Sequence, residues 1–241
     1  MSEADKARAW VTGASSGIGA AVANRLLEGS WRVLGTSRSV DRLPTQPGFD
    51  AESLDLEDLE GLPGRLGELL REHGTPDAAV LAAGVGLLGA LEESSFQQIR
   101  RLIDVDLTAQ IFIARALLPA MKRQGRGDLV LIGSEASLQG RRRGSVYCAA
   151  KFGLRGLAQA LREECATSGV RVSIVHPGTV RTPFFDDLEI EPGPEPVHAL
   201  EPDAVAAAVL YVLSLPPEAV VDEITLSPRV QQVRHRRSHD R

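Results

Sequence analysis

The chain has few cysteines, tyrosines and lysines, and it has no long apolar run. Cys148 and Cys165 are its two cysteines, and on one helix they would lie roughly 25 Å apart, which excludes a disulfide between them. No apolar stretch approaches the ~20 residues that span a bilayer, and the first ten residues lack the apolar core of a secretory signal. A net charge of −5 argues against general affinity for nucleic acids. We therefore expect a cytoplasmic protein that binds neither membranes nor nucleic acid.

Short apolar runs alternate with longer helical patterns along the chain. The expected strands are Ala9–Thr12, Arg32–Thr36, Gly48–Leu54, Ala78–Ala82, Asp128–Gly133, Arg171–Val175 and Glu223–Leu226. The expected helices are Ala20–Leu27, Glu57–Glu72, Phe96–Arg123, Val146–Thr167 and Pro202–Leu213. Such alternation is typical of βαβ units with a parallel sheet. It predicts one α/β domain over residues 1–241: a Rossmann-like, doubly wound sheet of about seven strands with helices on both faces, and a frayed tail over about 230–241.

A glycine-rich turn follows the first expected strand. The segment is Thr12-Gly13-Ala14-Ser15-Ser16-Gly17-Ile18-Gly19, and a helical pattern begins within it. Glycines at 13, 17 and 19 permit a sharp turn, close approach of a pyrophosphate to the backbone, and tight packing of the helix on the sheet. The positive N-terminal end of that helix suits phosphate groups. A glycine-rich turn alone marks only a tight loop, but the strand–turn–helix context predicts a dinucleotide site.

Tyr147 and Lys151 form a Tyr-x-x-x-Lys pair in a chain with two tyrosines and three lysines. On a helix, this spacing places both side chains on one face. A lysine ammonium lowers the pKa of a neighbouring phenol from its usual value near 10, so that the phenol can exchange a proton with an alcohol or a carbonyl. Taken alone, the pair fits a solvated helix face better; the glycine-rich turn favours the catalytic interpretation. Next to it, Cys148 is expected to be a core thiol rather than a second nucleophile.

Together with Ser134, thirteen residues before Tyr147, these motifs resemble the short-chain dehydrogenase/reductase family in its compact, single-domain branch. Three further segments follow in the family's order: Leu54-Asp55-Leu56, Leu81-Ala82-Ala83-Gly84 and His176-Pro177-Gly178-Thr179-Val180-Arg181-Thr182. The resemblance covers the chain from Val11 to about Leu226. It implies an NAD(P)-dependent oxidoreductase that interconverts an alcohol and a ketone or aldehyde. The alternative is a dinucleotide-binding regulator or scaffold with weak or no catalysis.

The resemblance also implies roles for individual residues. Tyr147 would exchange the proton, Lys151 would also bond the nicotinamide ribose, and Ser134 would bond the carbonyl oxygen. The family's fourth catalytic position is Asn, which helps to hold a relay water largely through its backbone carbonyl; here it is Asp106, in a chain whose single asparagine is Asn24. The implied cofactor-binding residues are Gly13, Ser15, Ser16, Gly17, Ile18, Gly19, Arg38, Asp55, Leu56, Ala82, Ala83, Gly84, Tyr147, Lys151, Pro177, Gly178, Val180 and Thr182. No metal is expected. The family usually has asparagine at the positions of Leu81 and Ala82. Its absence here puts some of the hydrogen bonding between strands in doubt.

The residues after the second expected strand bear on the choice of cofactor. A carboxylate there would bind the ribose 2′-hydroxyl of NAD and repel a 2′-phosphate. Instead the chain has Arg38, preceded by Ser37 and with Arg42 nearby. A guanidinium matches a phosphate in geometry and charge. We therefore expect NADP(H) to be favoured over NAD(H), the alternative being that Arg38 is an ordinary surface arginine.

The long helices indicate an oligomer. They are expected near Phe96–Arg123 and Val146–Thr167, and the first carries more apolar surface than one sheet-facing side requires. In the family the equivalent helices pair across a dimer two-fold axis, so we expect a homodimer or homotetramer. The alternative is a deeply buried helix within a monomer.

Phe184–Glu201 is the one conspicuous irregular stretch. Four prolines flank or interrupt it, so it cannot form a continuous helix. The resemblance implies that it is a substrate lid. Between Ser134 and Tyr147, the cluster Arg141–Arg143 must run past the mouth of the site. It either reads a negative or polar group on the substrate, pairs with the lid acids, or is simply solvated. Those acids are Asp186, Asp187, Glu189 and Glu191.

Overall fold

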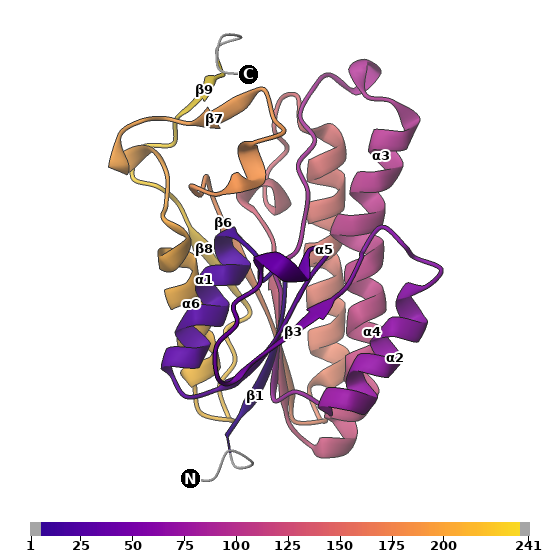
Figure 1. Cartoon of the computed structure of the whole chain (residues 1–241). Coiled ribbons are helices and arrows are strands. Elements are labelled where there is room, and N and C mark those ends of the chain that lie inside the picture. The colour runs from indigo at the N-terminus through magenta and orange to yellow at the C-terminus, as the bar shows by residue number, and fades with distance from the viewer. Residues whose placement is uncertain (1–5, 237–241) are drawn as a thin grey trace.

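A parallel sheet of seven strands forms the centre of the molecule (Figure 1). The computed structural model describes residues 6–236. From one edge to the other the strands are β3 (Phe49–Ser53), β2 (Arg32–Ser37), β1 (Arg8–Thr12), β4 (Ala78–Leu81), β5 (Gly127–Ile132), β6 (Val170–Pro177) and β8 (Glu223–Leu226). Every neighbouring pair is parallel. The predicted fold class is therefore confirmed, and the predicted strands lie within two residues of the observed ends.

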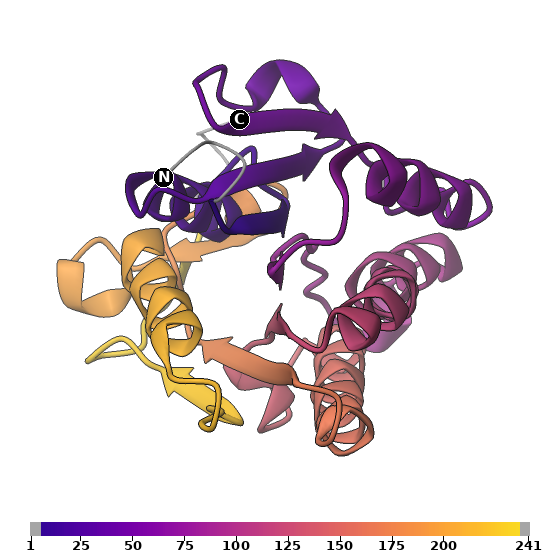
Figure 2. The same cartoon turned by 90° about the horizontal axis from the view of Figure 1, so that it is seen from below.

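Helices cover both faces of the sheet (Figures 1 and 2). One layer is formed by α1 (Gly17–Glu28) and α6 (Pro202–Ser214), and the other by α2 (Leu62–His73), α4 (Ala109–Gln124) and α5 (Ser145–Cys165), with α3 (Phe96–Ile103) leading into α4. Among residues 6–236, no helix is long and apolar enough to cross a membrane.

Two hydrophobic clusters lie on opposite faces of the sheet. In β1, Trp10 belongs to the cluster beneath α2, α4 and α5, whereas Ala9 and Val11 belong to the cluster beneath α1 and α6. In β5, Leu129 belongs to the cluster beneath α2, α4 and α5, and Val130 belongs to the cluster beneath α1 and α6. Successive side chains of a strand point to opposite faces, so a strand that is buried on both sides is a continuous apolar run. This burial is why the short apolar runs of the sequence form the sheet.

Two helix predictions need correction. Helix α2 begins at Leu62, not at Glu57, because the Asp58 side chain accepts a hydrogen bond from the Gly61 N–H and turns the chain first. The expected helix Phe96–Arg123 is interrupted by a π-helical turn, Asp104–Thr108, between α3 and α4. Single π turns inside α-helices are frequent at functional sites. Here the turn contains Asp106, which is fully buried.

The C-terminal segment is ordered where a frayed tail was expected. Strand β9 (Val233–His235) pairs antiparallel with β7 (Ile190–Pro192), a strand within the irregular stretch Phe184–Glu201. Figure 1 shows this small ribbon above the sheet. The prediction of fraying is therefore wrong for residues 230–236, while 237–241 lie outside the described residues. The irregular stretch contains no continuous helix, as its prolines predicted.

Candidate active site

A cavity of about 750 Å³ opens at the carboxyl ends of the strands. Its walls include the segments that follow β1, β2, β3, β4, β5 and β6. Strand order reverses direction between β1 and β4, and open α/β sheets bind ligands at such a switch point. Every residue predicted to bind a cofactor lines this cavity, together with Ser134. Asp106 does not line it.

The glycine-rich turn forms one end of the cavity. Gly13 has a φ of +68°, and a Cβ there would lie 2.9 Å from the Cα of Ala83. A Cβ at Gly19 would lie 2.3 Å from the Gly13 carbonyl oxygen. Glycine is therefore required for the conformation at Gly13 and for the contact between helix and turn at Gly19. The result is an exposed backbone surface at the N-terminus of α1, with the side chains of Ser15 and Ser16 beside it.

The end of β2 carries an ion pair that the sequence did not predict. Arg38 Nη1 lies 2.9 Å from Glu57 Oε1, and Arg101 contacts the same carboxylate oxygen at 2.9 Å. Both Arg38 and Glu57 line the cavity, and the side chain of Arg38 is 60% exposed. Ser37 donates a hydrogen bond of 2.9 Å to Ser15, which ties the end of β2 to the glycine-rich turn. Glu57 follows the expected Leu54-Asp55-Leu56 segment, but no spacing in the sequence indicated that it would pair with Arg38.

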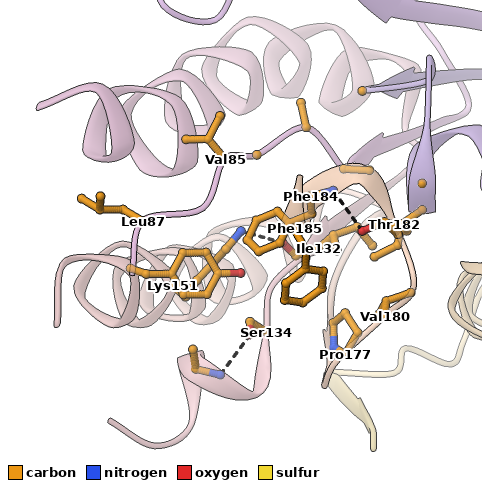
Figure 3. Close-up of a pocket in the computed structure, with 18 of the residues that line it drawn as sticks. Val85, Leu87, Ile132, Ser134, Lys151, Pro177, Val180, Thr182, Phe184 and Phe185 are labelled. Atoms are coloured by element: carbon orange, nitrogen blue, oxygen red, sulfur yellow. Dashed lines mark hydrogen bonds between the residues drawn. The ribbon is translucent and has the colours of Figure 1, made fainter. Parts of the chain in front are cut away.

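Ser134, Tyr147 and Lys151 meet at the other end of the cavity; Figure 3 labels Ser134 and Lys151 there. Ser134 lies just beyond β5, after Gly133, and its Oγ accepts the Ala136 N–H at 3.1 Å. Tyr147 and Lys151 lie one turn apart on α5, with Lys151 Nζ 5.5 Å from the centroid of the tyrosine ring. Lys151 Nζ also donates to the Ile132 carbonyl at 3.4 Å. Tyr147 and Lys151 therefore lie on one face of α5, as their spacing predicted.

Burial raises the pKa of Tyr147 above its usual value. Lys151 and a hydrogen bond with Ser134 act in the opposite direction, and the negative charge of Asp106 adds to the rise. The sequence predicted only the lowering by Lys151. In this structure desolvation of the phenol is the larger effect and outweighs the lowering by Lys151.

Asp106 lies behind Lys151. Its Oδ2 is 3.1 Å from Lys151 Nζ, and its Oδ1 accepts the Val85 N–H at 2.7 Å. Burial raises the pKa of the Asp106 carboxyl, while Lys151 lowers it. Burial lowers the pKa of Lys151, but Asp106 and Tyr147 reverse this and leave it raised. Asp106 thus contacts Lys151 through its charged side chain, whereas the expected contribution at this position was a backbone carbonyl.

Behind Ser134, a buried histidine occupies β6. A Cβ at Gly133 would lie 2.6 Å from His176 Nδ1, and His176 Nε2 lies 3.4 Å from Glu223 Oε2. His176 has no exposed surface. Burial lowers its pKa, partly offset by Glu223. Glu223 in turn accepts a hydrogen bond of 3.0 Å from Arg155.

The stretch Phe184–Glu201, which we call the lid, and the C-terminal segment Gln231–Arg236 both contribute to the wall of the cavity. Phe184, Glu189 and Ile190 line it from the lid, and Gln231, Val233 and His235 from the C-terminal segment. The lid acids pair with that segment: Arg234 Nε lies 2.6 Å from Glu191, and Arg236 lies 3.7 Å from Asp186. Nothing in the sequence indicated that these C-terminal residues line the cavity. A strand of three residues such as β9 is too short for a periodic pattern, and it forms only because β7 pairs with it.

The arginine cluster does not pair with the lid acids, so that expectation is wrong. Arg141 lies 3.1 Å from Glu135, and Arg143 lies 3.0 Å from Glu93. Glu135, directly after Ser134, also accepts hydrogen bonds from Ser227 and Gln231. Within residues 6–236, Arg142 has no ion-pair partner, and it lines the cavity.

The two cysteines are free and buried, as expected. Cys148 Sγ accepts the Arg141 N–H at 3.2 Å. The thiol therefore helps to hold the loop that carries the arginine cluster.

Comparisons with known proteins agree with this arrangement. Residues 7–192 match the family model for short chain dehydrogenases. An uncharacterised oxidoreductase of Staphylococcus saprophyticus is 30% identical over 229 residues, which is 91% of this chain and 96% of the relative. An alcohol dehydrogenase from the archaeon Thermococcus sibiricus, complexed with 5-hydroxy-NADP, has a TM-score of 0.85 at 30% identity, over 95% of this chain and 99% of that one. A metagenomic short-chain oxidoreductase in complex with NADP has a TM-score of 0.80 at 30% identity, over 95% and 100%.

The doubly wound sheet and the matched relatives define the class: an oxidoreductase that acts on CH–OH groups with NAD(P). The chain belongs to the short-chain dehydrogenase/reductase family. The family identification predicted from the motifs is confirmed.

Proposed function

We propose that this chain, acting as one domain over its length, is an NADP(H)-dependent oxidoreductase that interconverts an alcohol and a ketone or aldehyde. Ser134, Tyr147 and Lys151 are its catalytic residues. The observation that carries the proposal is that these three side chains meet in the same cavity as the glycine-rich turn. The cavity therefore has room for a dinucleotide at one end and a small carbonyl compound at the other.

The residues fit a dinucleotide. A Cβ at Gly13 or Gly19 would collide with backbone, so the turn leaves its own backbone open to a pyrophosphate. The N-terminus of α1 and the hydroxyls of Ser15 and Ser16 offer hydrogen-bond donors to phosphate oxygens. Asp55 and Leu56 line the part of the cavity where the resemblance places the adenine. When bound, the nicotinamide supplies or accepts the hydride.

The protein's own groups handle the proton. In carbonyl reduction, Tyr147 Oη donates a proton to the oxygen that receives negative charge as the hydride arrives. Ser134 Oγ donates a hydrogen bond to the same oxygen and holds it in position. In alcohol oxidation the transfer runs in reverse, and the phenolate accepts the proton. Lys151 stabilises that phenolate, since its ammonium lowers the pKa of Tyr147.

Two observations support NADP(H) over NAD(H). Arg38 lies at the end of β2, where a guanidinium can contact a 2′-phosphate, and within the described chain only its Nη1 is bonded. Both solved relatives described above were complexed with NADP or a derivative of it. The negative charge of the Glu57 carboxylate would repel a phosphate, but Arg38 and Arg101 both form ion pairs with this carboxylate.

The remaining proposals concern substrate and assembly. Arg142 is the member of the arginine cluster that is free to contact a negative or polar group on the substrate. The partly exposed apolar residues Ile111 on α4 and Phe152 on α5 are consistent with a homodimer or homotetramer. The cytoplasmic location stays a prediction.

A screen of reduced-nicotinamide absorbance with a panel of ketones and aldehydes tests the proposal. We expect carbonyl-dependent oxidation of NADPH, faster than that of NADH. Keto acids paired with their neutral esters in the same panel test whether Arg142 reads charge. If NADPH binds but no carbonyl in a broad panel is reduced, the alternative of a dinucleotide-binding regulator or scaffold replaces the enzyme proposal.

A further inference from the structure

Asp106 stands where the resemblance places an asparagine, and its carboxylate contacts Lys151 directly. Asp106 has no exposed surface, and only 7% of the Lys151 side chain is exposed. The two charged atoms lie 3.1 Å apart. A buried charge is tolerated when an opposite charge compensates it, so the pair is electrically self-contained. Together the two groups hold one proton and carry no net charge, whichever atom bears it.

A neutral pair affects Tyr147 differently from a lone lysine. A lone ammonium beside a phenol favours the phenolate, because ionisation then leaves the buried site neutral. With Asp106 present, the same ionisation leaves the site with a net negative charge. The charge of Asp106 accordingly raises the pKa of Tyr147, against the lowering by Lys151.

No other charged group offsets this arrangement within the described structure. Asp106 faces the Val85 N–H and Lys151, and Arg101 of α3 is a further cation that acts on it. Arg101 is 43% exposed and pairs with Glu57. Around Tyr147 the remaining groups are the Ser134 hydroxyl and the Cys148 thiol.

We propose that Asp106 is a positioning residue that neutralises Lys151 and keeps Tyr147 protonated, so that the site favours donating a proton to a carbonyl over taking one from an alcohol. The inference rests on the proposed function and gives it a preferred direction. In reduction, the carbonyl carbon gains a hydride from the reduced nicotinamide and its oxygen gains the Tyr147 proton. The C=O π bond is lost, an alcohol and oxidised nicotinamide form, and water returns a proton to the tyrosinate. Oxidation needs the phenolate first, which the neutral pair disfavours.

The scarcity of tyrosine makes this directly measurable. The chain has two tyrosines, and Tyr211 is 54% exposed on α6, away from the cavity. Tyr211→Phe therefore leaves Tyr147 as the sole source of tyrosinate ultraviolet absorbance, and adding Tyr147→Phe provides the blank. The titration needs no substrate, so it is independent of whether any carbonyl is reduced.

Two titrations decide the proposal. In the Tyr211→Phe protein, we expect Tyr147 to remain protonated above about pH 10, the usual phenol value, or until the protein unfolds as judged by circular dichroism. Adding Asp106→Asn should lower the midpoint by about one to three pH units. Asparagine keeps the acceptor for the Val85 N–H, which favours folding. Asp104→Asn, in the same π-helical turn, is the matched control and should leave the midpoint unchanged.

Kinetics provide the second readout. Asp106→Asn should shift the rising limb of the kcat/KM profile for alcohol oxidation, which reports formation of the tyrosinate, to lower pH. At neutral pH it should also raise kcat for oxidation relative to kcat for reduction. A merely structural role would lower both directions together without moving the profile. The proposal is overturned by a Tyr147 midpoint near neutrality in the Tyr211→Phe protein, or by an Asp106→Asn midpoint that is unchanged or higher.

Discussion

The ring of Phe184, on the lid, lies 5.9 Å from the ring of Tyr147, with a tilt of 57° between their planes. Phe184 also meets Phe185 edge to face at 5.3 Å. Figure 3 labels both phenylalanines beside Lys151 and Ser134. The lid therefore contacts the candidate acid–base residue directly, and a change in the lid should be felt at the site of proton transfer.

Replacing Phe184 with alanine should lower kcat/KM for carbonyl reduction by roughly 2- to 10-fold. An aromatic pair contributes about 0.5–1.5 kcal/mol beyond area burial, and its loss admits water near Tyr147. Phe96→Ala is the matched control, because that ring is 94% exposed on α3. Equal effects of the two changes on steady-state kinetics would contradict the role of the lid ring.

Replacing Arg38 with aspartate should move the cofactor preference from NADPH toward NADH. The change removes a partner of the 2′-phosphate and adds a charge that repels it, while a carboxylate can bond the ribose hydroxyls. The ratio of kcat/KM for the two cofactors is the measurement. Arg123→Asp, an exposed change at the end of α4, is the control. An unchanged ratio in Arg38→Asp would mean that Arg38 does not discriminate.

Reversing the charge of Arg234 should raise KM for the carbonyl substrate. Its ion pair with Glu191 joins β9 to the lid, and exposed pairs contribute about 0.2–1 kcal/mol, which corresponds to about 1.5- to 5-fold in KM. The double variant Arg234→Glu with Glu191→Arg should restore KM. Truncation after Arg229 should have a larger effect than truncation after Arg236. If both truncated proteins keep the wild-type KM, the C-terminal segment does not form part of the substrate site.

His176 makes stability depend on pH. Its pKa is lowered in the fold by burial, so the unfolded chain takes up a proton at a higher pH than the folded protein does. The stability that it contributes is fully present above the unfolded value of 6.5 and is lost as the pH falls from there toward the folded pKa. The slope from this group is at most about 1.4 kcal/mol per pH unit.

Denaturant unfolding of the wild type and His176→Asn between about pH 8 and pH 5 measures this dependence. We expect the free energy of unfolding of the wild type to fall more steeply below pH 6.5 than that of the variant. Parallel curves for the two proteins would show that His176 is not responsible.

The strands, the glycine-rich turn and the Tyr147–Lys151 pair were predictable from the sequence, because each depends on residues that are close together along the chain. β1 and β5 are apolar runs that the sheet buries on both faces, and the Tyr147–Lys151 spacing needs only a helix. Features that depend on distant partners were not predictable. β9 forms because β7 lies beside it in space, and Asp106 contacts Lys151 because a π-helical turn directs it inward. The net rise in the pKa of Tyr147 likewise depends on burial, which spacing does not reveal.

The most direct test of the central claim follows the hydride and the proton donor together. NADPH that carries deuterium at both C4 positions of the nicotinamide is incubated with a carbonyl substrate from the screen, and the alcohol is analysed by mass spectrometry. The wild type and Tyr211→Phe should place one deuterium on the former carbonyl carbon. Tyr147→Phe should still bind NADPH but form this product about 10²–10⁴-fold more slowly. Product without deuterium, or a Tyr147→Phe rate above about a hundredth of the wild-type rate, would contradict the account.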